Sequence, residues 1–282
     1  MPEPSPSGQQ AETRGRGVPS ERRAALRGWL SEAGDALISV FFPAGCRICE
    51  KPLTTASRVP ICGECLGSFA AVRGVVCELC GRPLASFGQP AEQPALCAAC
   101  RDHTYAFERA RSFALYEGPL IKAILLLKFE QIRPLGNWFA SRLREVVERE
   151  REALSADVVV PVPLHHQREK ERGHNQAALI SQPLAKMLCL PHKAVLLVRT
   201  KPRPNKHILS LEERWESVRG AFATRPGSQV DNQRVLLVDD VLTTGATLDA
   251  CSRALREAGA KAVIGLTVAR AIRNPVPSSV AW

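Results

Sequence analysis

Two neighbouring carboxylates stand between an apolar run and a cluster of small hydroxyl residues in VLLVDDVLTTGATL, residues 235–248. The apolar run before Asp239 and Asp240 predicts a buried strand, and the residues after the cluster predict a helix. A strand end joined to a helix start leaves backbone N–H groups and the positive end of the helix dipole available to bind a phosphate. The carboxylates accept hydrogen bonds and therefore suit vicinal hydroxyls beside that phosphate, as in a ribose 5-phosphate. The predicted phosphate-binding residues are Thr243, Thr244, Gly245, Ala246 and Thr247.

A second group of donors lies in VPVPLHHQREKERGHNQ, residues 160–176, which begins in another predicted strand. Arg168, Lys170 and Arg172 carry positive charge, and two amide side chains follow them. Charged donors of this kind suit the diphosphate part of a ligand. The alternative is a solvated loop whose positive charges are cancelled by the glutamates between them.

Eight of the ten cysteines form four C-x-x-C pairs. Two pairs make a tetrahedral four-thiolate site, so four pairs predict two structural zinc ions without an open coordination position. A disulfide framework or redox motifs are the alternatives, but disulfide frameworks rarely repeat one spacing in this way. Sequential pairing is favoured, and an interleaved arrangement also fits the spacing. Cys189 and Cys251 stand alone in apolar segments, which predicts small core residues. The predicted zinc ligands are Cys46, Cys49, Cys62, Cys65, Cys77, Cys80, Cys97 and Cys100.

Strands and helices alternate from about Tyr105 onward, which predicts a parallel α/β sheet. Ligands of such sheets bind at the carboxyl ends of the strands, where both donor groups begin. The polar segment 199–220 is either a mobile lid over the site or a surface insertion. Predicted strands cover 108–118, 157–163, 193–199, 235–240 and 261–270, and predicted helices cover 118–130, 136–150, 175–188 (interrupted by Pro183) and 247–259.

Charge and composition bound the remaining choices. The chain has 282 residues and a formal net charge of +10, of which +9 falls in residues 106–282. Two zinc ions bound by eight thiolates would lower the total to about +6. A positive field favours anionic partners, either phosphorylated metabolites or nucleic acid. No apolar run reaches the ~20 residues that a spanning helix requires, so no membrane insertion is expected.

The ends of the chain are expected to lie outside the packed domains. Residues 1–20 are rich in Pro, Ser, Gly and Gln, which predicts a disordered tail. Residues 21–43 are expected to form an amphipathic helix, because the apolar stretch from Ala36 lies too far into the chain for a typical signal sequence.

Several segments together resemble one known family. Residues 235–248 resemble the loop that binds phosphoribosyl pyrophosphate (PRPP) in type I phosphoribosyltransferases. With VPVPLHHQREKERGHNQ, with ILLLKF at 124–129, with the LS...R...VRGAF pattern at 209–222 and with the four cysteine pairs, the chain is similar to the ComF family of competence proteins. The resemblance covers roughly residues 35–270.

The resemblance implies both a fold and a role. The implied fold is α/β: a parallel-sheet, type I phosphoribosyltransferase-like domain at 106–272, an N-terminal double zinc ribbon at 44–105, and a C-terminal tail at 273–282. The implied location is the cytoplasm. The implied role is to bind PRPP and to handle incoming single-stranded DNA during natural transformation, together with DNA-uptake proteins. The alternative is a genuine phosphoribosyltransferase that transfers a phosphoribosyl group from PRPP to an unidentified base or amine.

The resemblance also implies roles for individual residues. The two carboxylates hold the ribose hydroxyls with magnesium nearby, and the threonine-rich loop holds the 5-phosphate. The implied catalytic residues are Asp239, Asp240, Arg168 and Arg172, and the further PRPP-binding residues are Lys128, Gly173, Asn175 and Gln176.

Three positions depart from the family pattern. His174 stands where an aromatic residue is usual, and it is expected to replace that residue rather than to contact a diphosphate. Lys206 replaces a usual glutamine and Ser217 a usual asparagine. Roles that the family gives to those two side chains are therefore not carried over.

Overall fold

A central sheet of four parallel strands organises the molecule. The computed structural model describes residues 45–53, 57–84, 95–202, 210–228 and 230–272. The strand order is β1-β6-β5-β2, and every neighbouring pair is parallel. The predicted parallel α/β fold is therefore confirmed. The strands are β1 (Arg109–Leu115), β2 (Val158–Pro161), β5 (Arg234–Leu242) and β6 (Ala262–Arg270).

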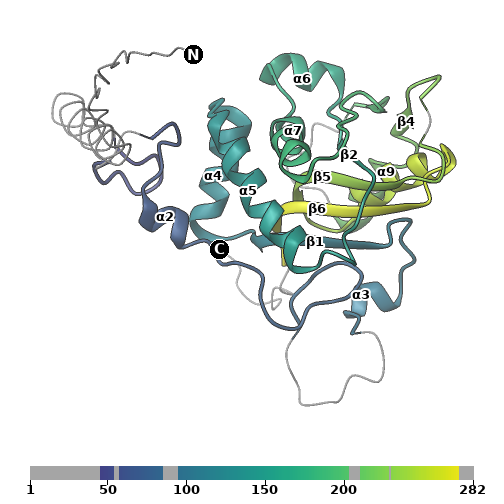
Figure 1. Ribbon diagram of the computed structural model, residues 1–282, viewed down its shortest axis with the longest axis horizontal. Helices are drawn as coiled ribbons and strands as arrows, with labels where there is room; N and C mark the ends of the chain where they lie inside the picture. Colours follow the sequence, from purple (N-terminus) through teal and green to yellow (C-terminus); the bar gives the residue numbers. More distant parts are fainter. Residues whose placement is uncertain (1–44, 54–56, 85–94, 203–209, 229, 273–282) are drawn as a thin grey trace, which may run out of the picture.

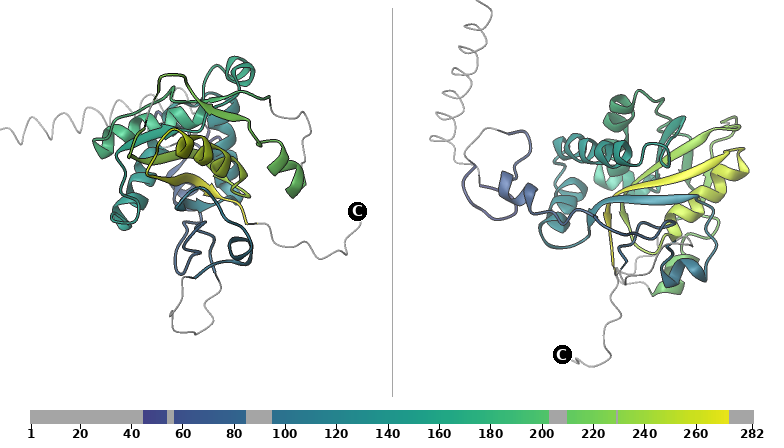
Figure 2. Two further views of the ribbon diagram at one scale, coloured as in Figure 1. Left: turned by 90° about the vertical axis from the view of Figure 1, so that its right-hand side faces the viewer. Right: turned by 60° about the horizontal axis from the view of Figure 1, so that its bottom comes forward.

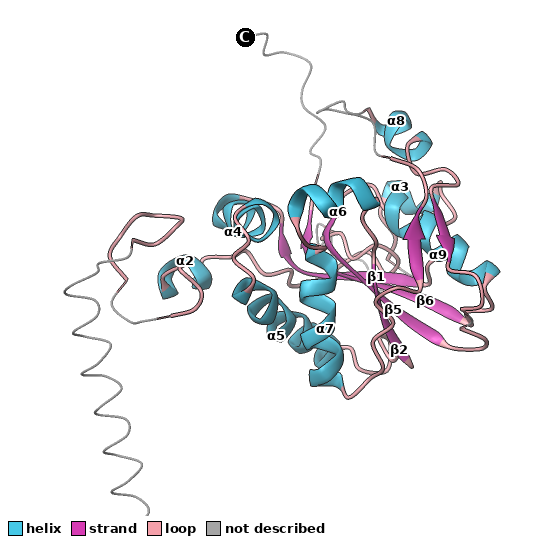
Figure 3. Ribbon diagram, turned by 90° about the horizontal axis from the view of Figure 1, so that it is seen from above, coloured by secondary structure: helices cyan, strands magenta, loops and turns pink. Residues whose placement is uncertain are grey.

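Helices cover both faces of this sheet because its central strands are apolar on both faces. In β5, Leu236 and Val238 contribute to one hydrophobic cluster, whereas Leu237 contributes to another on the opposite face. Runs of this kind are typical of buried parallel strands. Figures 1 and 3 show α4, α5 and α7 on one side of the sheet and α9 on the other. The helices are α4 (Gly118–Phe129), α5 (Pro134–Arg149), α7 (Gln176–Leu188) and α9 (Ala246–Glu257).

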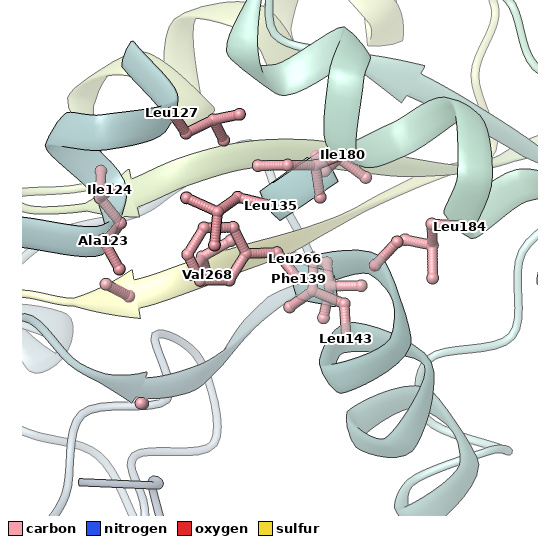
Figure 4. Close-up of a cluster of buried hydrophobic side chains, with 14 of the residues drawn as sticks. Ala123, Ile124, Leu127, Leu135, Phe139, Leu143, Ile180, Leu184, Leu266 and Val268 are labelled. Atoms are coloured by element: carbon pink, nitrogen blue, oxygen red, sulfur yellow. The ribbon is translucent and has the colours of Figure 1, made fainter. Parts of the chain in front are cut away.

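The larger core lies between the sheet and helices α4, α5 and α7 (Figure 4). Phe139 of α5 is fully buried there, against Leu266 of β6 among others. Helices α5 and α7 meet closely at Gly136, where an added Cβ would lie 2.4 Å from the carbonyl oxygen of Leu179. Pro183 has no N–H to donate to that carbonyl. Helix α7 nevertheless continues through Pro183 instead of being interrupted there.

Three segments differ from the sequence prediction. The predicted strand 193–199 is reduced to β3 (Leu197–Arg199), which pairs antiparallel with β4 (Phe222–Thr224) outside the main sheet. The predicted polar loop after β2 contains the short helix α6 (His166–Arg172), which ends at Gly173 with φ 72°. The polar segment 199–220 contains α8 (Leu211–Glu216).

The cysteine pairs lie in two separate places. Figures 1 and 2 show α2 (Gly63–Gly67) beside α4, well away from α3 (Ala98–Arg101), which lies on the other side of the sheet. The segment that carries α2 packs Ile48 and Ile61 into the same apolar cluster as α4 and α5. The segment that carries α3 is tied to β1, whose Ala110 N–H donates to the Leu79 carbonyl over 2.6 Å.

None of the helices in the described ranges has the length and apolarity that a bilayer crossing requires. The predicted tail at 1–20, the predicted amphipathic helix at 21–43 and the predicted tail at 273–282 lie outside the described residues, as does Lys206.

Candidate functional site

The eight paired cysteines form two clusters that fit zinc. Their sulfur atoms lie within 4.8 Å of one another in each cluster. The Sγ atoms of Cys49 and Cys62 are 3.7 Å apart, as are those of Cys80 and Cys97. Four sulfurs about 2.3 Å from one ion in tetrahedral geometry are separated by about 3.8 Å, so the spacing suits a four-thiolate zinc site. Sequential pairing is confirmed: one cluster is Cys46, Cys49, Cys62 and Cys65, and the other is Cys77, Cys80, Cys97 and Cys100.

The two unpaired cysteines have opposite environments. Cys251 is fully buried in α9, as predicted, and burial followed by the charge of Asp239 raises the pKa of its thiol. The prediction for Cys189 was wrong, because this residue is exposed. It ends α7 in the left-handed conformation at φ 55°, which turns the chain away from the helix.

A cavity of about 320 Å³ lies at the carboxyl ends of β2 and β5, and we call it the sugar-phosphate cavity. It is lined by the end of β5, by the loop that follows, and by the first turn of α9. That loop joins β5 to α9, as the sequence predicted. The lining residues from this segment are Asp239, Asp240 and Val241 of β5, Thr243 and Thr244 of the loop, and Ala246 and Thr247 of α9.

The two carboxylates have different partners. Asp240 is buried and forms an ion pair with Lys128 of α4, with 2.5 Å between Oδ2 and Nζ. Asp239 accepts a hydrogen bond from the Asp240 backbone N–H over 2.8 Å. Burial and then the charge of Asp240 raise the pKa of Asp239 well above its usual value. The pair therefore carries excess negative potential that one lysine only partly offsets, which suits a divalent cation or the hydroxyls of a sugar.

The threonine-rich loop has the backbone geometry that a phosphate requires. Gly245 is the N-cap of α9 with φ 89°, a conformation that favours glycine. The loop ends at the helix N-terminus, where backbone N–H groups lack partners within the helix. One of them, the N–H of Ala246, donates a hydrogen bond to Oγ1 of Thr244 over 3.3 Å. Gly245 shapes this turn although it does not line the cavity itself.

The opposite wall comes from α6 and the start of α7. Arg168, Arg172 and Gln176 line the cavity, and the Arg172 guanidinium donates to Oε1 of Gln176 over 3.1 Å. Arg172 also stacks on Phe129, with its Cζ 4.8 Å from the ring centroid. The segment that carries these donors is a helix closed by Gly173, which holds them on one element.

Two residues of the same motif are turned away from the cavity. The Asn175 side chain accepts from the Ala177 N–H and donates to the Val162 carbonyl, so it caps α7. The ring of His174 is buried, and its Nε2 lies 2.8 Å from the Leu127 carbonyl oxygen. This position agrees with replacement of a buried aromatic residue.

Other cavity residues were not singled out from the sequence. Tyr116 follows β1 and His165 precedes α6, so their places at strand ends could have indicated them. Burial, and then the charges of His166 and Arg199, lower the pKa of His165, which favours its neutral form. Arg199 and Arg214 come from the segment 199–220, so part of the predicted lid does reach the cavity.

Two side chains connect the second cysteine cluster to the threonine-rich loop between β5 and α9, which we call the phosphate loop after its predicted ligand. Arg270, at the end of β6, donates to the carbonyls of Leu242 and Thr243 and lies 3.5 Å from Sγ of Cys80. The Tyr105 hydroxyl donates to the Thr244 carbonyl over 3.2 Å. The ring of Tyr105 also packs on the loop glycine, where a Cβ would be 2.9 Å from Cε1. Neither residue was predicted, because only the three-dimensional fold brings them to the loop.

Fold and site together define a zinc-ribbon protein with a phosphoribosyltransferase-type domain. A model of the double zinc ribbon domain matches residues 37–101, and a model of the phosphoribosyl transferase domain matches residues 177–279. Two structural zinc ions, one per cluster, follow from the ribbon match and the sulfur spacing.

The chain belongs to the ComF family of competence proteins. It is 30% identical to the DNA utilization protein YhgH of Salmonella typhimurium over 78% of this chain and 94% of that protein. It is 29% identical to competence protein F of Haemophilus influenzae over 82% of this chain and 99% of that protein. It is 29% identical to competence protein ComFC of Bacillus subtilis over 72% of this chain and 81% of that protein.

Proposed function

We propose that this protein binds PRPP with magnesium in the sugar-phosphate cavity and handles incoming single-stranded DNA during DNA uptake. The observation that carries the proposal is the convergence of three chemistries on one cavity: two carboxylates, a helix N-terminus and two arginines. Each suits one part of PRPP, namely the ribose hydroxyls, the 5-phosphate and the diphosphate.

The roles of the residues follow from their positions. Asp239 and Asp240 accept hydrogen bonds from the ribose hydroxyls, and magnesium bound near them offsets the charge of the diphosphate. Thr243 to Thr247 bind the 5-phosphate through backbone N–H groups and hydroxyls. Arg168 and Arg172 approach the diphosphate from the other wall. Lys128 holds the Asp240 carboxylate in place through their ion pair.

A genuine phosphoribosyltransferase is the second candidate, and the two arginines on the cavity wall favour it. The bond from C1 of the ribose to the diphosphate oxygen would break as a bond from a nitrogen of the acceptor forms. The diphosphate would leave with the bonding electron pair, stabilised by Arg168 and Arg172, and the acceptor nitrogen would lose its proton to solvent. The cavity supplies positioning and charge, and no protein nucleophile is required.

The proposed DNA role is supported by charge and by relatives. The domain of residues 106–282 carries +9 of the formal charge, and related proteins are called competence and DNA utilization proteins. Binding driven by such charge weakens steeply as salt is raised. Neutralising Arg168 and Arg172 together should weaken single-stranded DNA binding and reduce its salt dependence. DNA affinity that is unchanged by both treatments would refute the electrostatic account.

The test of the PRPP site is calorimetric titration of PRPP with magnesium into the zinc-loaded protein. Binding is expected for the wild type and should be lost when Asp239→Ala and Asp240→Ala are combined. Glu148→Ala is the control, because that carboxylate lies exposed on α5 and, among the residues that the structure describes, pairs with Arg144 one turn away. Absence of PRPP binding to the wild type would overturn the proposal, and release of pyrophosphate with a base present would establish the transferase.

A further inference from the structure

A second cavity of about 610 Å³ adjoins the sugar-phosphate cavity, and we call it the aromatic cavity. Its walls come from the second cysteine cluster and the residues after it, from α8, and from the end of β6. The two cavities share four lining residues, so a ligand can extend from one into the other. The shared residues are Tyr116, Arg214, Thr243 and Thr244.

Three aromatic rings form one wall of the aromatic cavity. The His103 ring lies 4.5 Å from that of Tyr105 and 4.4 Å from that of Trp215, measured between centroids. Tyr105 and Trp215 are 5.9 Å apart and tilted by 38°. Two of these rings come from the chain just after the zinc ribbon, and the third comes from α8. A wall of this kind suits a flat heterocycle, because aromatic side chains stack on the face of any nucleobase.

Polar groups on the same cavity can bind the edge of a heterocycle. Nε2 of His103 is buried and has no hydrogen-bond partner within the described part of the chain, and it can donate or accept according to its tautomer. Asp102 adds an acceptor, and Arg270 adds a guanidinium whose buried Nε has no partner among the described residues. A purely apolar ligand would leave these groups without partners, whereas a nucleobase carries both donors and acceptors.

We propose that the aromatic cavity binds the heterocyclic base of a nucleoside 5′-phosphate whose sugar phosphate lies on the Thr243–Thr247 loop. The proposal rests on the proposed sugar-phosphate site and extends it to the ligand's base. It also gives the second zinc ribbon a part in ligand binding: the metal fixes the chain on which His103 and Tyr105 stand. The base belongs either to a free nucleotide or to a nucleotide of single-stranded DNA.

The test compares adenosine 5′-monophosphate with ribose 5-phosphate by calorimetry on the full zinc-loaded chain with magnesium. The two ligands share the sugar phosphate and differ in the base. Adenosine 5′-monophosphate is expected to bind at least about tenfold more tightly, in keeping with the usual contribution of base stacking. Trp215→Ala should abolish this preference without changing the affinity for ribose 5-phosphate, and Trp215→Phe should restore most of it.

The matched control is Trp138→Phe, because Trp138 packs beside Phe69 and Phe113, away from this cavity. It should keep the preference for the nucleotide. Trp215 also contacts the apolar core, so His103→Ala provides a second variant that should reduce the same preference if Trp215→Ala fails to fold.

The outcomes separate the two proposals. If ribose 5-phosphate binds and the nucleotide binds no more tightly, the base-binding inference is wrong and the sugar-phosphate site stands. If neither ligand binds the wild type, the proposed function and this inference fall together. Displacement of the nucleotide by a short oligodeoxyadenylate, but not by an abasic strand of equal length, identifies a DNA base as the occupant; displacement by neither identifies a free nucleotide.

Discussion

Replacing Arg270 with methionine tests whether the second zinc ribbon and the phosphate loop are one structural unit. Nη1 of this buried residue lies 3.0 Å from the Leu242 carbonyl oxygen, 2.5 Å from that of Thr243 and 3.0 Å from that of Ala271. Nη1 carries two hydrogens, so about two of these bonds are well made, and Nη2 adds a contact to Cys80. At about 1.5–3 kcal/mol for each charged hydrogen bond, the bonds contribute about 3–6 kcal/mol.

Part of this contribution is offset by burial of the guanidinium, whose Nε has no partner among the described residues. We therefore expect Arg270→Met to lower the free energy of unfolding by about 3 kcal/mol. PRPP affinity should fall as well, because the loop carbonyls lose the group that fixes them. Zinc content should stay at two ions per chain, since all eight sulfur ligands remain.

The measurement is urea unfolding with zinc in excess, followed by metal analysis and PRPP titration. Arg144→Met is the control, because Arg144 makes an exposed ion pair with Glu148 on α5. Such a pair contributes about 0.5 kcal/mol or less. If Arg270→Met destabilises the protein no more than this control and leaves PRPP affinity unchanged, the ribbon and the loop are not coupled through this residue.

Three other predictions follow from local geometry. Gly136→Ala should destabilise the protein by about 1–3 kcal/mol in urea unfolding, because its Cβ would lie 2.4 Å from the Leu179 carbonyl oxygen; unchanged stability would mean that α5 and α7 can separate freely. A thiol reagent should modify exposed Cys189 in the zinc-loaded protein within minutes, while Cys251 reacts only after unfolding; equal rates would contradict the burial of Cys251. PRPP affinity should rise as the pH rises through the raised pKa of Asp239, because the ionised carboxylate is the form that binds the ligand. The free energy of unfolding should fall as the pH rises through this pKa, because the folded state then loses the proton that it binds more tightly than the unfolded state does. Asp239→Asn should remove the pH dependence of binding.

The local pattern of the sequence was enough to predict the sheet and the position of the threonine-rich loop between β5 and α9. Apolar runs form most of β5 and β6, as is typical of buried parallel strands. The run in β5 is followed by a polar turn and an amphipathic helix, and few other structures fit that order. The apolar run before Asp239 was therefore enough to place this residue near the carboxyl end of a strand. The zinc ligands were predictable for a similar reason, because the C-x-x-C spacing fixes two sulfurs on one turn.

The missed elements are short and depend on contacts or caps. Helix α8 follows its N-cap Ser210, and the capping box also uses Glu213. This signal is present in the sequence, but a helix of 6 residues is too short to show apolar periodicity. Strand β3 was predicted too long and in the wrong sheet, because apolar residues near Val195 suit a strand but only pairing with β4 decides its length. The Cys189 prediction failed because an apolar neighbourhood along the chain does not imply burial at a helix end.

The contacts that could not be predicted are those that join the second ribbon to the domain. The partners in each contact are more than a hundred positions apart: Tyr105 meets Thr244, and Cys80 meets Arg270. No periodicity or motif encodes such a pair, since each member also fits an ordinary surface or core position.

The two zinc ribbons contribute to the domain in different ways, and this difference bears on what the metals do. The first ribbon places Ile48 and Ile61 in the core beside α4, so its folding adds apolar burial far from the phosphate loop. The second reaches that loop through Arg270, which contacts Cys80, and through Tyr105, which follows its last cysteine pair. Because the free energy of metal binding is also free energy of folding, zinc in the second ribbon stabilises the conformation of the loop itself. A metal bound there would thereby act on the proposed ligand site without touching the ligand, through the Arg270 guanidinium and the Tyr105 phenol.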